Sequence, residues 1–438
     1  MRHFATRNLN QRDTVFNAKH ASPPCRTPLD VSPDKRYVAL IVLLLLPYFE
    51  PGVVFAFSPT LTVLFKIAKM LSIVTIAVLF LWKKRCDALS GCALALAAAM
   101  LGSCLITGSA LSSYVFQWLP LICTILLVSW ASPNHLEELA WAAMILTASI
   151  SLINLLTMLA LPQGTYDAGY TAKADHFFYG HRNASYQFVF ISVGASWLLD
   201  SRKGRRFSLR TLALLILGAA QIALAFSATT FLALVFGVVF GLVIQARRSK
   251  VFFNGLSLLA AYIISFVALV FFRVNEYLGF LINGLLGKST TLTGRTAIWD
   301  QAIKQMDPSH LLFGYGFDGQ RIVLGVGNSY PHPHNEILAV WVCGGTICAI
   351  LFIAMLLLSC RALYRHRSSY SSCILCVLLG CFLIVSLTET IMHCSFGLAI
   401  ALAFYWNRDR GGFWHSKRER TRGQLKRIVL PKAPSKTR

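Results

Sequence analysis

Residues 272–345 read FRVNEYLGFLINGLLGKSTTLTGRTAIWDQAIKQMDPSHLLFGYGFDGQRIVLGVGNSYPHPHNEILAVWVCGG. Arginine, histidine, acidic residues, glycine and proline crowd together in this stretch, and long apolar runs flank it on both sides. Runs of that kind have the length and composition of membrane-spanning helices. The stretch therefore predicts a large loop on one face of a membrane, closed by a helix that re-enters at His334–Asn335–Glu336. We expect the chemistry of the protein to lie in this loop.

The composition of the chain is that of an integral membrane protein. Of its 438 residues, 56% are hydrophobic and 13% are charged, whereas a soluble domain carries roughly 25% charged residues. The mean hydropathy is +0.60. The apolar runs are continuous and do not alternate with polar residues, which favours helices over a β-barrel. The chain is therefore predicted to form one polytopic, all-α membrane domain.

About twelve spans are predicted with a window of about 20 residues. The first is interrupted by Pro47 and by Glu50–Pro51. The transmembrane domain is expected at 37–406, with extracytoplasmic loops at about 161–183 and 273–334 and basic cytoplasmic tails at 1–36 and 407–438. The predicted limits of the spans are 37–57, 60–82, 90–107, 111–131, 138–160, 184–200, 208–225, 227–246, 251–272, 335–359, 372–388 and 390–406.

The formal net charge of +23 is explained by membrane topology without a nucleic-acid partner. If the N-terminus is cytoplasmic, most of the 41 lysine and arginine residues fall in cytoplasmic segments and few in the outer loops. Cytoplasmic loops of membrane proteins collect such residues. This distribution predicts a multi-pass protein of the bacterial cytoplasmic (inner) membrane with both termini cytoplasmic, so that the large loop lies outside and the tails meet water or anionic membrane lipid.

Arg295 is the first candidate for chemistry. Thr293–Gly294–Arg295 precedes a stretch with helical periodicity, and Thr291 or Thr293 could cap that helix. Arginine in a first turn is poorly placed against the helix dipole. It fits if an anion docks at the helix start and binds both the N–H groups and the guanidinium. The alternative is a surface arginine that donates to a loop carbonyl.

His334 is the second candidate, in the sequence Pro331–His332–Pro333–His334–Asn335–Glu336 that opens the tenth span. Asn335 is the expected N-cap of that helix. A histidine at the membrane surface can take up a proton near neutral pH, which suits the activation of a hydroxyl. The alternative is an interfacial histidine without a role. The i, i+2 spacing of His332 and His334 does not favour a shared metal ion.

Three further features supply candidate binding residues. Arg182 ends an outer loop of aromatics, amides and charges that also contains Asp167, Tyr170, Lys173 and Asp175, and it is a second possible anion ligand. Lys66 and Lys69 lie near the outer end of the second span, where they either snorkel or form an anion-holding wall. Tyr315 lies in Gly314–Tyr315–Gly316–Phe317–Asp318–Gly319, either an ordinary turn or a turn near a ligand. The full set of predicted substrate-binding residues is Arg182, Lys66, Lys69, Asn335, Glu336 and Tyr315.

The 12 cysteines predict neither disulfides nor a metal site in the large loop. Nearly all of them lie in apolar runs, where cysteine acts as a small hydrophobe. The isolated pair Cys373 and Cys376 is interpreted as helix packing. The aspartates of the loop are scattered without metal-ligand spacing, so neither a metal nor another cofactor is predicted.

The motifs TGRTAIW, FGYGFDG and HPHNEILAVWVCGG, in this order over roughly residues 292–346, resemble the O-antigen ligase and O-antigen polymerase family of bacterial envelope proteins. The run from Tyr179 to Ala184 is similar to an outer loop of that family. The resemblance implies a membrane glycosyltransferase that moves a glycan from undecaprenyl pyrophosphate to a hydroxyl of a glycan or lipid-glycan acceptor outside the membrane. It also implies that Arg295 holds the pyrophosphate and that His334 activates or positions the acceptor hydroxyl.

One departure from the family pattern concerns the span before the loop. The family often has a Ser-Arg pair there, but this chain reads Ser227–Ala228–Thr229–Thr230, so Arg182, Lys66 or Lys69 would have to supply a second phosphate contact. A reaction that is independent of metal and inverts the anomeric carbon is expected. A transporter or flippase for a lipid-linked or anionic solute is the competing function, and a sensor or scaffold is a third. The choice between polymerase and ligase stays open.

Overall fold

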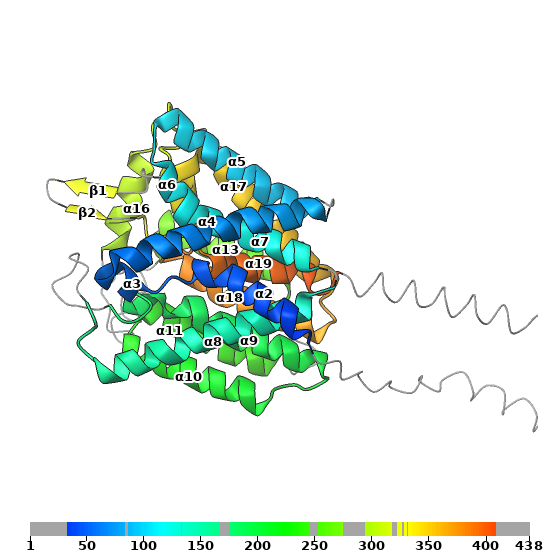
Figure 1. Ribbon diagram of the computed structural model, residues 1–438. Helices are drawn as coiled ribbons and strands as arrows, with labels where there is room; N and C mark the ends of the chain where they lie inside the picture. Colours follow the sequence, from blue (N-terminus) through cyan, green and yellow to red (C-terminus); the bar gives the residue numbers. More distant parts are fainter. Residues whose placement is uncertain are drawn as a thin grey trace, which may run out of the picture. The chain divides into compact units, whose positions relative to one another are not determined.

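The structure is a computed structural model that consists almost entirely of helices (Figure 1). Two short antiparallel strands, β1 (Ile322–Gly325) and β2 (Asn328–Tyr330), are the exception to the predicted all-α fold. The residues that the structure describes are 33–83, 86–132, 134–166, 176–244, 253–274, 294–317, 322–325, 328–330 and 332–408. The predicted tails, other than residues 33–36 and 407–408, lie outside them.

The first half of the chain forms two broken spans and several unbroken ones. Asp34 caps the first helix, and Pro47 and Pro51 separate its three pieces, as the sequence predicts. The elements are α2 (Lys35–Leu45), η2 (Leu46–Tyr48), α3 (Gly52–Phe57), α4 (Pro59–Trp82), α5 (Ala88–Thr107), α6 (Leu111–Ser113), η3 (Tyr114–Trp118), α7 (Leu119–Ala131) and α8 (Leu136–Ala160).

The second half contains a short helix, α16, that runs beside the bundle. It begins in the predicted large loop, whose described part is therefore folded against the helices. The elements are η4 (Arg182–Ser185), α9 (Tyr186–Arg202), α10 (Leu209–Ala225), α11 (Ala228–Val243), α13 (Gly255–Val270), α16 (Arg295–Lys304), α17 (Glu336–Arg365), α18 (Tyr370–Ser386) and α19 (Cys394–Tyr405).

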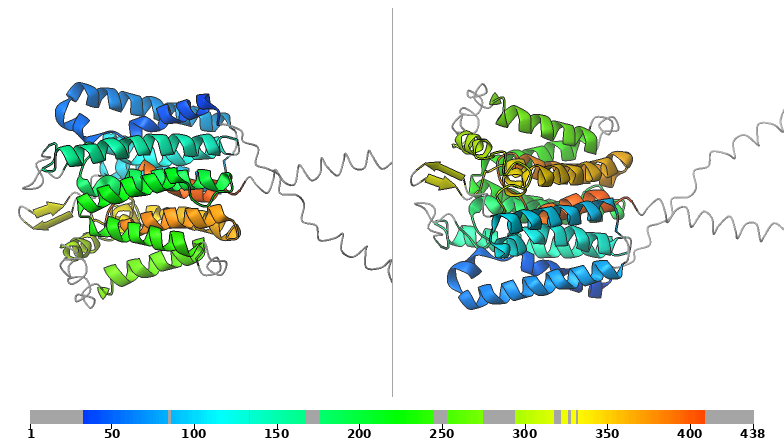
Figure 2. Two further views of the ribbon diagram at one scale, coloured as in Figure 1. Left: turned by 90° about the horizontal axis from the view of Figure 1, so that it is seen from below. Right: turned by 90° about the horizontal axis from the view of Figure 1, so that it is seen from above.

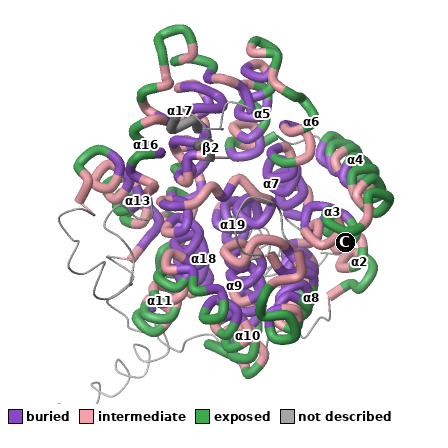
Figure 3. Tube along the Cα trace, turned by 90° about the vertical axis from the view of Figure 1, so that its left-hand side faces the viewer, coloured by how far each residue is buried: buried purple, intermediate pink, exposed green. Residues whose placement is uncertain are grey.

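The helices run roughly side by side and differ in burial from the centre to the edge (Figures 2 and 3). Nearly every residue of α19, α18, α9 and α7 is buried, whereas α4 buries few of its residues and exposes leucines, valines and isoleucines. An exposed apolar face of this kind suits contact with lipid. Cys373 and Cys376 are buried in α18, consistent with their interpretation as packing residues.

The two ends of the bundle differ in chemistry. The loop end carries residues 46–58, 161–166, 176–185, 294–317 and 387–393, and lies at the left in Figure 1. The basic end carries residues 202–208, 366–369 and 406–408. Its segments are joined by contacts such as Tyr370 Oη donating to the Arg206 carbonyl at 3.1 Å.

Five helices of the described part are long and apolar enough to cross a membrane: α4, α5, the continuous segment Leu111–Ala131, α8 and α17. Five more, α10, α11, α13, α18 and α19, are apolar but shorter, with 10–17 residues. Every predicted span overlaps a helix of the structure. The chain is therefore a helical membrane protein, while the number of about twelve crossings stays a prediction.

A break in α17 allows a loop to enter the bundle. Gly345 has φ 67° and ψ −169°, which interrupts the helical hydrogen bonds. Residues 311–316 bind the exposed backbone: Tyr315 N donates to Val342 O at 2.9 Å, Gly316 N donates to Cys343 O at 2.9 Å, and Thr346 N donates to Leu311 O at 2.9 Å. Non-helical backbone at membrane depth needs such internal partners.

The close approach at this break requires glycine on both sides. A Cβ on Gly345 would lie 2.2 Å from Leu312 O, and a Cβ on Gly314 would lie 2.6 Å from the Cys343 backbone. The FGYG and CGG motifs therefore meet each other in the fold. This turn is a packing turn, which agrees with the ordinary-turn alternative of the sequence analysis.

The substitution Gly345→Ala should destabilise the protein by about 2–4 kcal/mol, because it adds a clash to a left-handed backbone conformation. Gly102→Ala is the matched control, because Gly102 lies within α5 and a Cβ there meets nothing within 4 Å. The stability of this variant should not fall. Thermal unfolding of the detergent-solubilised protein measures both. Equal melting temperatures for the two variants would contradict the proposed role of the break.

Candidate functional site

Arg295 is the first residue of α16. Gly294 occupies the N-cap position with φ 85°, and the candidate caps Thr291 and Thr293 lie outside the described residues. The buried residues Ile298, Trp299 and Ala302 hold α16 against α17 and α13. The guanidinium, whose side chain is 18% exposed, donates from Nη2 to Oε1 of Glu389.

His334 lies two residues before α17 in an uncommon backbone conformation, with φ 51°. Non-glycine residues rarely adopt positive φ, and functional sites are where such conformations concentrate. Asn335 caps α17 as predicted, since its Oδ1 accepts from Leu338 N at 3.1 Å. Its Nδ2 also donates to Leu387 O at 3.0 Å. The cap therefore joins the start of α17 to the end of α18 and holds His334 beside residues 387–391.

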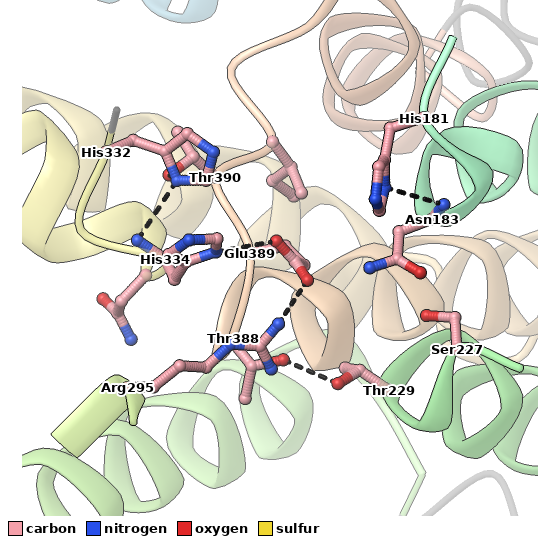
Figure 4. A network of polar contacts seen from close by, with 12 residues as sticks. His181, Asn183, Ser227, Thr229, Arg295, His332, His334, Thr388, Glu389 and Thr390 are labelled. Atoms are coloured by element: carbon pink, nitrogen blue, oxygen red, sulfur yellow. Dashed lines mark hydrogen bonds and ion pairs between the residues drawn. The ribbon is translucent and has the colours of Figure 1, made fainter. Parts of the chain in front are cut away.

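Glu389 connects Arg295 and His334 (Figure 4). It lies between α18 and α19; its Oε2 binds His334 Nδ1 at 3.1 Å while Oε1 accepts from Arg295. The carboxylate is 14% exposed. Burial alone would raise the pKa of Glu389, but the hydrogen bond from His334 and the charge of Arg295 outweigh it and lower the pKa. Glu389 is therefore a charged carboxylate shared by a guanidinium and an imidazole.

Sequence reasoning missed Glu389. It fell in the one-residue gap between the predicted spans 372–388 and 390–406, where no motif marked it. The available signal was its charge: it is an acidic residue between two of the most apolar runs of the chain, and ionisable residues in such places are costly and usually functional.

Hydroxyl groups of α11 border the same site. Thr229 Oγ1 and Thr388 Oγ1 share a hydrogen bond of 2.7 Å, and Ser227 Oγ and Thr230 Oγ1 share one of 2.9 Å. Figure 4 shows Ser227 and Thr229 on the α11 side of Glu389. The segment in which the family often has an arginine thus lies at the site but contributes uncharged hydroxyls.

His332 extends the cluster on the other side of His334. Their ring centroids are 4.1 Å apart. His332 Nδ1 accepts from His334 N at 3.3 Å and lies 3.3 Å from Thr390 Oγ1. Burial and the neighbouring charge of His334 lower the pKa of His332 to about 4. His332 is therefore neutral at physiological pH.

Glu336 and Asn335, both predicted to bind substrate, are buried at 0% and 1% exposure. Oε2 of Glu336 accepts from the backbone N–H of Ile391. Their contacts are thus with the 387–391 connection, which they hold in place beside His334.

Lys69 and Lys66 are not brought to Arg295. Lys69 is 7% exposed and does not snorkel; its Nζ donates to Glu50 Oε2 at 3.1 Å and to Phe116 O at 3.2 Å. Burial raises the pKa of Glu50 although Lys69 acts in the opposite direction. Lys66 is exposed, with Nζ 5.9 Å from the centre of the Phe116 ring. Both lie on α4, across the bundle from α16 (Figure 3).

Tyr315 also lies apart from the cluster in its contacts. Arg182 is half-buried in η4, between His181 and Asn183, which Figure 4 shows facing the site. Tyr315 Oη donates to Asp307 Oδ2 at 3.2 Å, and its ring stacks on His310 at 3.8 Å, beside the far end of α16 from Arg295. The other predicted loop residues, Asp167, Tyr170, Lys173, Asp175, Asp318 and Gly319, lie outside the described residues.

The fold and the site together define a polytopic helical membrane protein with an arginine, a glutamate and a histidine converging at one end of its bundle. Residues 213–353 match the family model described as O-antigen ligase, the family that the three motifs resemble. The matched range contains Arg295 and His334 and ends before Glu389. A search of curated proteins finds no match.

Acidification should destabilise the protein through His332. An unfolded chain protonates this imidazole below a pKa of about 6.5, whereas the folded protein does so only near 4, so the free energy of unfolding falls as pH drops between these values. Between pH 7 and pH 5, the melting temperature of the variant His332→Gln should fall less than that of the wild type. Equal losses in the two proteins would contradict this assignment.

Proposed function

We propose that this protein transfers a glycan from undecaprenyl pyrophosphate to an acceptor hydroxyl on the extracytoplasmic side of the bacterial cytoplasmic membrane. The observation that carries this proposal is the convergence of Arg295 and His334 on Glu389. The guanidinium of Arg295 suits an anionic leaving group, and the imidazole of His334 suits the activation of a nucleophile. Both lie within residues 213–353, which match the O-antigen ligase model.

Arg295 would bind the pyrophosphate of the donor. A guanidinium has five N–H donors, and the contact with Glu389 uses only Nη2, so other donors remain for phosphate oxygens. The first turn of α16 adds backbone N–H groups and the positive end of the helix dipole. Pyrophosphate leaves as an anion and needs its charge neutralised without a proton. These groups can act without a metal ion.

His334 would act as the general base. Its Nδ1 is bound to Glu389, so Nδ1 carries the proton and Nε2 is the basic nitrogen. The acceptor oxygen attacks the anomeric carbon as its proton passes to Nε2, and the bond from that carbon to the pyrophosphate oxygen breaks. A single displacement of this kind inverts the anomeric carbon. Glu389 would fix the tautomer and stabilise the imidazolium that forms.

The loop end would face the outside of the cytoplasmic membrane. Lysine and arginine gather at the basic end among the described residues, and such residues mark the cytoplasmic face. The site lies among the helix ends, where a lipid-linked donor can keep its tail in the bilayer and its pyrophosphate at the surface. Several described charged residues near the loop end pair with an opposite charge: Lys69 with Glu50, Arg273 with Asp300, and Arg295 with Glu389.

Arg295→Ala and His334→Ala should each reduce glycan transfer by about 100-fold or more, because they remove charge stabilisation and the base, respectively. Lys304→Ala, an exposed cation at the other end of α16, is the control and should complement fully. Each gene replaces the chromosomal copy, and surface polysaccharide is separated on gels. Accumulated single repeats would indicate a polymerase, and polymer kept on its lipid carrier a ligase. Full complementation by both site variants would refute the site.

Glu389→Gln should lower the rate of transfer by about tenfold or more while the protein stays folded, because the amide cannot stabilise an imidazolium as a carboxylate does. Glu389→Ala should also destabilise the protein, since it leaves the half-buried Arg295 without its partner. Transfer rate and melting temperature are measured on the same purified samples. A Gln variant with the wild-type rate would show that Glu389 only holds the structure together.

A further inference from the structure

A cavity adjoins the Arg295–Glu389–His334 cluster. It has a volume of about 270 Å³ and lies between α5, η3, the start of α9, the start of α17 and residues 390–393. This volume is just below the usual range of small-ligand pockets, about 300–1,000 Å³, and suits a ligand of about one ring. Its lining contains apolar side chains, among them Trp118, Met100 and Phe317, here called the apolar wall. It also contains polar side chains, among them Gln187, His332 and Thr390, here called the polar wall.

A chain of hydrogen bonds fixes the orientation of Gln187. Ser395 N donates to His393 Nδ1 at 3.3 Å, so the proton of this imidazole is on Nε2, which lies 3.0 Å from Tyr179 Oη. Tyr179 Oη in turn donates to Gln187 Oε1 at 2.9 Å. Burial lowers the pKa of His393 to about 3, which keeps the ring neutral. The amide oxygen of Gln187 is thus occupied, and its NH₂ group, which also donates to the Tyr186 hydroxyl, has one further N–H for a ligand.

His332 supplies a second donor to the polar wall. Its Nδ1 accepts from His334 N, so in the neutral ring the proton is on Nε2. The polar wall therefore offers the N–H groups of Gln187 and His332. Such a wall favours a ligand that is rich in acceptor oxygens, and the Trp118 wall favours a ligand with an apolar ring face.

We infer that this cavity binds one sugar ring of the acceptor glycan. A pyranose ring combines hydroxyl or acetamido oxygens at its edge with C–H groups on its faces, and the two walls match these features. His332 lines the cavity and its ring is 4.1 Å from that of His334, so a sugar held here would place a hydroxyl near the general base. The inference rests on the proposed function and assigns the acceptor to the side of His334 that is opposite Arg295.

The decisive substitution is Gln187→Glu, which keeps an oxygen for Tyr179 and replaces the NH₂ donor with an acceptor. The acceptor probe is the repeat-unit oligosaccharide released by mild acid from the lipid carriers of a deletion strain, and inorganic pyrophosphate, as an inhibitor, probes the donor site. The oligosaccharide concentration at half-maximal rate should rise about tenfold, with inhibition by pyrophosphate unchanged. Gln163→Glu, an exposed glutamine of the same end, should change neither. Melting temperatures verify folding.

A second variant, Ala339→Leu, places a larger side chain in the buried lining of the cavity. It should also raise the oligosaccharide concentration at half-maximal rate. Its control is Ala260→Leu on the exposed face of α13. Wild-type kinetics for both cavity variants, or a change confined to pyrophosphate inhibition, would overturn the sugar subsite while leaving the proposed function intact. A wild-type protein that transfers nothing would refute the proposed reaction. Oligosaccharide binding is then measured by tryptophan fluorescence, and binding that Gln187→Glu weakens would still support the subsite.

Discussion

The carboxylate of Glu389 is the interaction on which the site depends. A half-buried guanidinium and an imidazole are costly to desolvate, and each needs a charged or hydrogen-bonded partner. Glu389 serves both, with one oxygen for Arg295 and the other for His334. A single side chain thereby fixes the distance between a cation that suits a phosphate and a base that suits a hydroxyl.

The 387–393 connection can carry this carboxylate because the start of α17 holds it on two sides. Asn335 donates to the carbonyl of Leu387, and Glu336 accepts from the N–H of Ile391, so residues on both sides of Glu389 are tied to α17. Further along α17, the break at Gly345 admits residues 311–316, which follow α16. The same helix therefore positions the segments that contribute His334, Glu389 and Arg295.

Two sides of His334 differ in chemistry, and the difference suits a transfer between two substrates. Arg295 and the start of α16 form a side with positive character. On the other side, the neutral rings of His332 and His393 and the amide of Gln187 border a cavity with an aromatic wall. Histidines kept neutral by burial add hydrogen-bond donors there without adding charge. Such a division separates the site of a charged leaving group from that of an uncharged nucleophile.

The helical elements, the interrupted first span, the Asn335 cap and the candidates Arg295 and His334 could all be predicted, because apolar runs, prolines and caps are properties of adjacent residues. The structure alone revealed Glu389, the Lys69–Glu50 pair and the cavity beside Gln187. Arg295 and Glu389 are 94 residues apart in the chain, and Glu50 lies in the break before α3 whereas Lys69 lies within α4. Local pattern determines which segments become helices, whereas which charges meet between helices is decided only when the helices pack, because burial makes each charge depend on a partner from elsewhere in the chain.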